Sequence, residues 1–111
     1  MSLIDLPTAK RHLRVDGAEE DALIQIYAEA AETAAIDFLN RNVYATQAAL
    51  DEADEPPGAL PMVINAAVRA AILLMLGHLY ANREDVVSTA VHKLPVGAHS
   101  LLFPYRVGMG V

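Results

Sequence analysis

The feature that most constrains the fold is a continuous apolar run in the second half of the chain. From Ala70 to Leu76 no residue is polar, and the surrounding pattern predicts a long helix over Pro61–Asn82. A surface helix of a small protein needs one apolar stripe, whereas a helix that is apolar all round must be covered on every side. A chain of 111 residues has few other elements to provide that cover. The run therefore predicts that neighbouring subunits complete the packing and that the chain is an assembly protein.

The same run is too short to cross a membrane, because a spanning helix needs about 20 mostly apolar residues. Arg69 interrupts the run on one side, His78 follows on the other, and Asn65 lies earlier in the same predicted helix. The first residues carry Asp5 and Pro7 instead of the basic start and apolar stretch of a secretion signal. We therefore expect a soluble, unexported protein with no membrane partner.

Two helices are predicted before this run. Asp5 can cap a short helix that carries Pro7 in its first turn, where a missing N–H costs little. A long helix over Glu19–Arg41 follows, and Asp16 with Glu19 resembles a capping box. Its apolar residues recur at spacings of three and four, namely Leu23, Tyr27, Ala30, Ala34 and Phe38, backed by Ile24, Ala31, Ala35 and Leu39. The sequence therefore predicts an all-α fold, a small bundle built on two long antiparallel helices.

The alanines suggest how the two long helices meet. Those at positions 30, 31, 34 and 35 are expected to face those at 66, 67, 70 and 71, because small side chains let helices approach closely. Residues 45–58 predict a solvated loop, with a helical turn at Thr46–Leu50. After Glu84 the pattern predicts an irregular or extended C-terminal arm, with one last turn over Gly97–Phe103 that Pro104 stops. Residues 1–111 are expected to form a single domain.

The composition argues against an enzyme, a cofactor protein and a metal protein. The chain has no cysteine, and none of its four histidines has a second ligand at the spacing of a helical metal site. The acidic run Asp51–Glu55 lacks the alternating ligands and central glycine of a calcium loop. The net charge is −6, whereas affinity for DNA comes largely from Lys and Arg. We expect no catalytic, cofactor or metal site and no specific DNA binding.

Two sets of residues are candidate contact sites. A subunit interface is expected on the long apolar helix, where apolar side chains left over after packing meet a neighbour and two charges set the register at the rim. These residues are Ile72, Met75, Leu76 and Leu79, with Arg83 and Glu84. A partner-docking arm is expected near the C-terminus, because Tyr and Arg are enriched at interface anchor points. Its residues are Leu101, Leu102, Phe103, Pro104, Tyr105 and Arg106.

Short motifs follow one another in a fixed order along nearly the whole chain. They are Leu6, residues 10–16, Glu20-Asp21, Leu23-Ile24, residues 27–31, Pro61, residues 70–76, Tyr80, residues 82–84, Leu94-Pro95, Leu101-Leu102 and residues 104–106. Together they resemble the gp6-like head–tail connector family of tailed phages and prophages, whose members have also been labelled as possible DNA-packaging proteins. The resemblance implies a small helical subunit that forms a homo-oligomeric ring beneath the portal protein. Such a ring extends the DNA channel, lets DNA pass without specific binding and receives the tail-completion proteins.

The resemblance also implies a location, the head–tail junction of the virion, with the host cytoplasm as the place of assembly. Other classes remain as alternatives. A small helical DNA-binding regulator would need a basic recognition helix, which neither long helix provides. A helical-bundle enzyme or metal carrier would need inward Glu and His at paired spacings. Another oligomeric interaction module is the third alternative, and the solution mass would separate a dimeric regulator from a monomer or a large ring.

Overall fold

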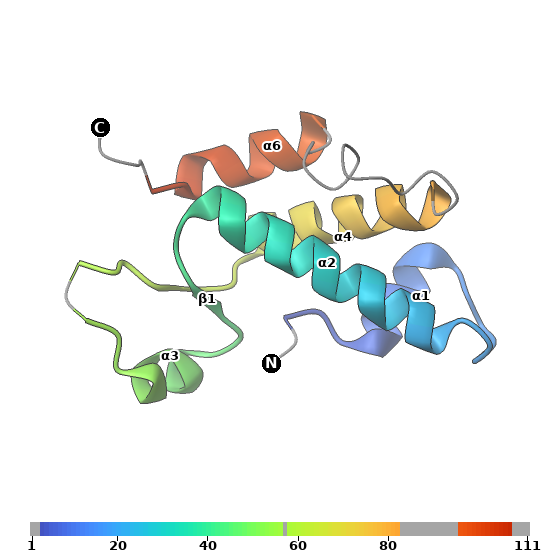
Figure 1. Ribbon diagram of the computed structural model, residues 1–111, viewed down its shortest axis with the longest axis horizontal. Helices are drawn as coiled ribbons and strands as arrows, with labels where there is room; N and C mark the ends of the chain where they lie inside the picture. Colours follow the sequence, from blue (N-terminus) through green and yellow to red (C-terminus); the bar gives the residue numbers. More distant parts are fainter. Residues whose placement is uncertain (1–2, 57, 83–95, 108–111) are drawn as a thin grey trace.

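A computed structural model describes residues 3–56, 58–82 and 96–107. Figure 1 shows a helical bundle with one very short pair of strands. The elements in chain order are α1 Leu6–Leu13, α2 Asp21–Leu39, β1 Val43–Tyr44, α3 Gln47–Ala53, β2 Met62–Val63, α4 Ala66–Ala81, α6 Val96–Leu102 and the 3-10 helix η2 Phe103–Tyr105. The prediction of a small helical bundle with a short N-terminal helix and two long helices is confirmed.

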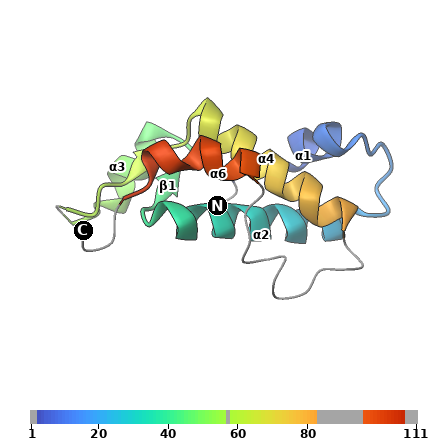
Figure 2. The same cartoon turned by 90° about the horizontal axis from the view of Figure 1, so that it is seen from above.

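The two long helices, α2 and α4, run in opposite directions and pack against each other along their length (Figures 1 and 2). Helix α6 lies along α4, and α1 packs against both α2 and α4. The core lies between these four helices, and its fully buried larger side chains are Ile4, Ile24, Leu39, Val68, Ile72, Leu76 and Leu102. The apolar helix α4 is thus covered from three directions by segments of its own chain.

The alanine seam between the long helices is confirmed in part. Ala31, Ala35 and Ala71 are fully buried, whereas Ala66 and Ala70 are exposed on the outer side of α4. The core face of α2 consists of the set expected only to back the main stripe, Ile24, Ala31, Ala35 and Leu39, together with Ala28, which the sequence pattern assigns to neither set. The other stripe is half-buried at the flanks of the helix. The core-facing side of α2 is therefore shifted by one residue position, about 100° around the helix, from the stripe that the sequence pattern favours.

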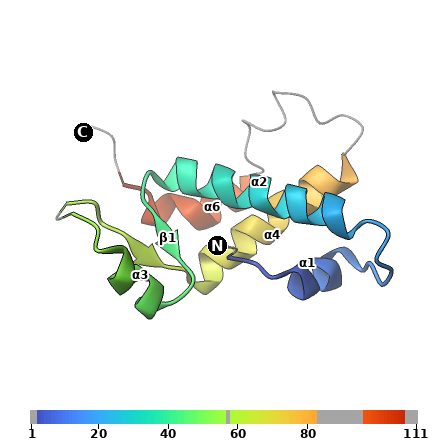
Figure 3. The same ribbon diagram turned by 60° about the horizontal axis from the view of Figure 1, so that its bottom comes forward.

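The start of α4 differs from the expectation. Pro61 was expected in its first turn, but the helix begins at Ala66, and the side chain of Asn65 accepts the N–H of Val68 at 2.9 Å. The preceding residues pair in parallel with β1 instead, with Met62 opposite Val43. Because these backbone groups bond to β1, they are unavailable for a helical turn. Helix α3 lies in the connection between β1 and β2, at the end of the molecule away from α1 (Figure 3).

The helix starts show which capping signals hold. Asp5 caps α1 by accepting the N–H of Thr8 at 2.8 Å, as expected. The prediction that Asp16 and Glu19 form a capping box is wrong. A turn precedes α2, and the N-cap residue of α2 is Glu20, whose side chain makes no capping bond. The turn expected near Thr46 is a full helix, α3, with Thr46 as its cap.

The C-terminal region is more regular than an irregular or extended arm. Residues 96–102 form α6 and residues 103–105 form η2. Ala98 and Leu102 are fully buried, because α6 lies against α4 with these two side chains in the core. The part of the expected arm between positions 84 and 95 lies outside the described residues.

Candidate functional site

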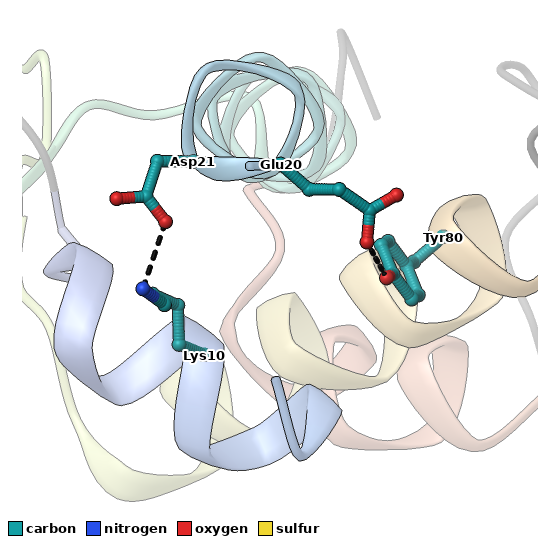
Figure 4. Close-up of polar contacts among 4 residues, drawn as sticks. All are labelled: Lys10, Glu20, Asp21 and Tyr80. Carbon is teal, nitrogen blue, oxygen red and sulfur yellow. Dashed lines mark hydrogen bonds and ion pairs between the residues drawn. The ribbon is translucent and has the colours of Figure 1, made fainter. Parts of the chain in front are cut away.

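The first residues of α2 connect three helices. Asp21 forms an ion pair with Lys10 of α1, with 2.8 Å between carboxylate oxygen and Nζ, and the hydroxyl of Tyr80 in α4 donates to the carboxylate of Glu20 (Figure 4). The two adjacent carboxylates point to opposite sides of α2, one toward each neighbour. Together they link α1 and α4 to the start of α2.

A buried carboxylate in the middle of α2 attaches the beginning of the described chain. Glu32 is only 6% exposed, and one of its oxygens accepts the backbone N–H groups of Leu3 and Ile4, each at 3.0 Å. A charged group buried in a core is stable only when it is hydrogen-bonded or paired, so this arrangement is structural. Glu32 is not among the residues that the sequence singles out, although its spacing of four from Ala28 and three from Ala35 places it on their face of the helix.

The end of α2 attaches the C-terminal segment. Arg41 donates to the carbonyls of Tyr105 and Pro61, both at 3.3 Å. The N–H of Val107 donates to the carbonyl of Leu39 at 2.9 Å. These bonds join backbone positions far apart in the sequence and fix η2 beside the last turn of α2.

Three rings and a guanidinium gather where α6 and η2 meet α2. We call this set, Phe38, His99, Phe103 and Arg106, the aromatic patch. The ring of His99 lies 5.1 Å from that of Phe38 and 5.6 Å, stacked, from that of Phe103. The guanidinium carbon of Arg106 lies 5.0 Å from the centre of the Phe38 ring, and its Nε donates to the carbonyl of Phe38 at 2.9 Å. Phe103 is nevertheless 59% exposed, so the patch is ordered without being covered.

These features resemble a contact surface more than a reaction centre. Among the described residues, no group of three His, Asp or Glu side chains lies close enough to hold a metal ion. None of the described helices has both the length and the apolar character needed to cross a bilayer. A depression at the end of α2, lined by Asp37, Arg41 and Glu55 among others, is open to solvent, and Arg41 in its wall is already bonded to two carbonyls.

The model of the phage gp6-like head–tail connector protein family matches residues 3–106 of the chain. The chain belongs to this family. No curated protein and no solved structure gives a match. Members of the connector family are structural components of the phage particle, which agrees with a site built from packing and exposed side chains.

The connector's expected subunit interface requires a correction. Ile72, Met75, Leu76 and Leu79 were expected to remain for a neighbour, but all four are buried inside the chain, at 7% exposure or less. Helix α6 and helix α1 occupy the sides of α4 that the sequence alone leaves open. The outer side of α4 instead carries Leu74, which is 42% exposed. The expected rim charges, Arg83 and Glu84, lie outside the described residues.

The expected docking arm of the connector divides into two parts. Leu102 is fully buried, and Leu101 and Tyr105 are half-buried against the core. Phe103, Pro104 and Arg106 are exposed. Only the second group is available to another protein, and two of its three members belong to the aromatic patch.

Proposed function

We propose that this connector is the subunit of a homo-oligomeric ring at the head–tail junction of a tailed phage. In this proposal the ring lies beneath the portal protein, extends the DNA channel and receives the tail-completion proteins. The family match over residues 3–106 is the observation that carries the proposal. The ring itself would assemble in the host cytoplasm, on DNA-filled heads.

The distribution of exposed apolar side chains supports a subunit that contacts neighbours on more than one side. Ile26 on α2 is 61% exposed, Val96 on α6 is 83% exposed, and Phe103 on η2 is 59% exposed. A head-to-tail contact between two different surfaces closes into a ring when its rotation allows. Surfaces on separate helices suit such a contact.

The charge of the chain supports a role as a conduit for DNA. A net charge of −6 repels the phosphate backbone, so DNA can pass a ring of such subunits without being held. We expect no duplex DNA binding at physiological salt. A salt-dependent mobility shift at micromolar protein would contradict the conduit role.

Two measurements test the ring. The solution mass is followed as the protein concentration rises, and the purified chain is added to filled heads that carry the portal but lack a connector. We expect a monomer that converts to a large closed ring, or that assembles on the heads, where electron microscopy shows added density under the portal. A stable dimer that never joins the heads would overturn the proposal.

A further inference from the structure

Helix α3 has a surface that the other described residues leave uncovered. It has seven residues, none of them fully buried, and it lies at one end of the molecule beside β1 (Figures 1 and 3). An isolated helix of this length is not stable in water by itself. The half-buried Ala49 and Leu50 lie on its inner side, whereas Ala48 and Glu52 are exposed.

The exposed side of α3 combines a small apolar side chain with a free carboxylate. Ala48 and Glu52 are four residues apart, so they are neighbours on one face of the helix. The Glu52 side chain has no hydrogen-bond or ion-pair partner within residues 3–56, 58–82 and 96–107. Asp51 on the adjoining face is different, because it accepts from Gln47 at 2.9 Å.

The aromatic patch presents the complementary pair. Phe103 and Arg106 are one 3-10 turn apart, and the N–H of Arg106 donates to the carbonyl of Phe103 at 3.2 Å. The Nε bond and the ring of Phe38 hold the guanidinium in place. No bond from its two terminal nitrogens reaches another side chain or carbonyl in the part of the chain that is described. An arginine that is already oriented loses little freedom when it binds a carboxylate through both nitrogens.

The two surfaces belong to elements on opposite sides of the α2–α4 pair. Helix α6 lies on one side of the α2–α4 pair and α3 on the other, as the view from above shows with α6 nearest the reader and α3 behind (Figure 2). Two complementary surfaces on opposite sides of one subunit are the requirement for a head-to-tail contact between copies.

We propose that α3 of one copy docks on the aromatic patch of the next copy, with Glu52 binding Arg106 and Ala48 covering the ring of Phe103. This rests on the proposed ring and names the contact that builds it. Charge complementarity supports a second copy as the occupant. The chain is acidic overall, and it exposes the oriented Arg106 beside the uncovered ring of Phe103, so a carboxylate of another copy is a suitable partner. The methyl group of Ala48 is small enough to let the ring lie against the helix.

Engineered cysteines test the contact, and the absence of native cysteine makes the readout clean. One batch carries Ala48→Cys and a second carries Ser100→Cys, an exposed position one turn before Phe103 that leaves the patch intact. The two batches are mixed at concentrations at which the unmodified chain assembles, and are then oxidised mildly. We expect a disulfide-linked dimer that contains one chain of each kind.

The matched control pairs Ala48→Cys with Thr33→Cys, which lies exposed on the outer side of α2. We expect no cross-link above background from this pair. Rings that form while the Ala48–Ser100 pair links no better than the control would overturn the contact and leave the ring standing. A chain that stays monomeric and does not join heads would overturn the ring, and this contact with it.

Charge reversal provides a second test. Arg106→Glu and Glu52→Arg should each raise the concentration for half-assembly by about tenfold or more, as expected for one lost charge-assisted contact. Combined in one chain, they should recover at least about threefold of the lost assembly, because the pair is re-formed with its signs exchanged, although the new arginine lacks the support of the Phe38 ring. Arg106 also binds within its own chain, so a folding defect in Arg106→Glu would not be rescued from α3. Failure of rescue, with both variants folded, would overturn the proposed pairing.

Discussion

Replacing Leu102 by Ala tests whether the C-terminal segment belongs to the core. The Leu102 side chain is fully buried where α6 lies against α4. Removing a fully buried leucine side chain costs about 2–5 kcal/mol, through lost burial and the cavity left behind. For a domain of this size, each kcal/mol lowers the melting temperature by about 4 °C. We therefore expect Leu102→Ala to lower the melting temperature by roughly 8–20 °C.

The adjacent residue provides the control. Phe103 is larger than Leu102 but 59% exposed, so Phe103→Ala should cost no more than about 1 kcal/mol, including its stacking on His99. Both variants are melted by far-ultraviolet circular dichroism at a concentration at which the chain is monomeric. An unchanged melting temperature for Leu102→Ala would refute the packing of α6 on α4. It would favour the original prediction that residues 101–106 form an arm free to dock on a partner. Equal losses from both variants would refute the division between buried and exposed residues.

Three further predictions concern polar groups. Glu32→Ala should lower the free energy of unfolding, measured in urea, by about 2–4 kcal/mol, because two backbone N–H groups lose their acceptor. Glu32→Gln keeps an acceptor oxygen and should lower it by only about 1 kcal/mol. Equal effects of the two substitutions would contradict these hydrogen bonds. Asn65→Ala should cost about 1 kcal/mol and speed amide exchange in the first turn of α4, while Asn65→Asp should keep the cap and change neither by much. The hydrogen bonds from the Thr8 side chain and N–H lower the pKa of Asp5 below its ordinary 3.8, so its stabilisation of α1 is present above pH 3.8 and is lost as the pH falls through the lowered value. The protection factors of the α1 amides, which remove the intrinsic pH dependence of exchange, should therefore fall as the pH drops below 3.8, and Asp5→Asn should flatten that dependence.

Local signals in the sequence predicted most of the elements. Asp5 with Pro7 marks the start of α1, and the spacing of apolar residues marks α2, because capping and periodicity depend on residues only a few positions apart. Pro61 was misleading for the opposite reason. The pairing of Met62 with Val43 joins positions far apart in the chain, and no local pattern announces it.

The same limit applies to the candidate site. The sequence predicts a contact site at residues 101–106, and Phe103 and Arg106 are exposed there. It could not show that α6 folds back to bury Leu102, or that α4 is covered by α1, α2 and α6 together. The burial of Leu76 within its own chain therefore could not be predicted from the sequence. Phe38 joins the aromatic patch only because α2 and η2 meet in three dimensions.

The attachment of the C-terminal segment to the end of α2 has a consequence for newly made chains. The positions of Phe38 and Arg106 are 68 residues apart, a stretch that a ribosome synthesises in roughly 3–14 s at about 5–20 residues per second. Until residues 96–107 have emerged, the carbonyl of Leu39 lacks the N–H of Val107, and the core faces of α2 and α4 lack the cover of α6. The aromatic patch is made from both the early and the late parts of the chain. A nascent chain therefore cannot display this surface before its core has closed, so the order of synthesis alone keeps incomplete subunits from using it.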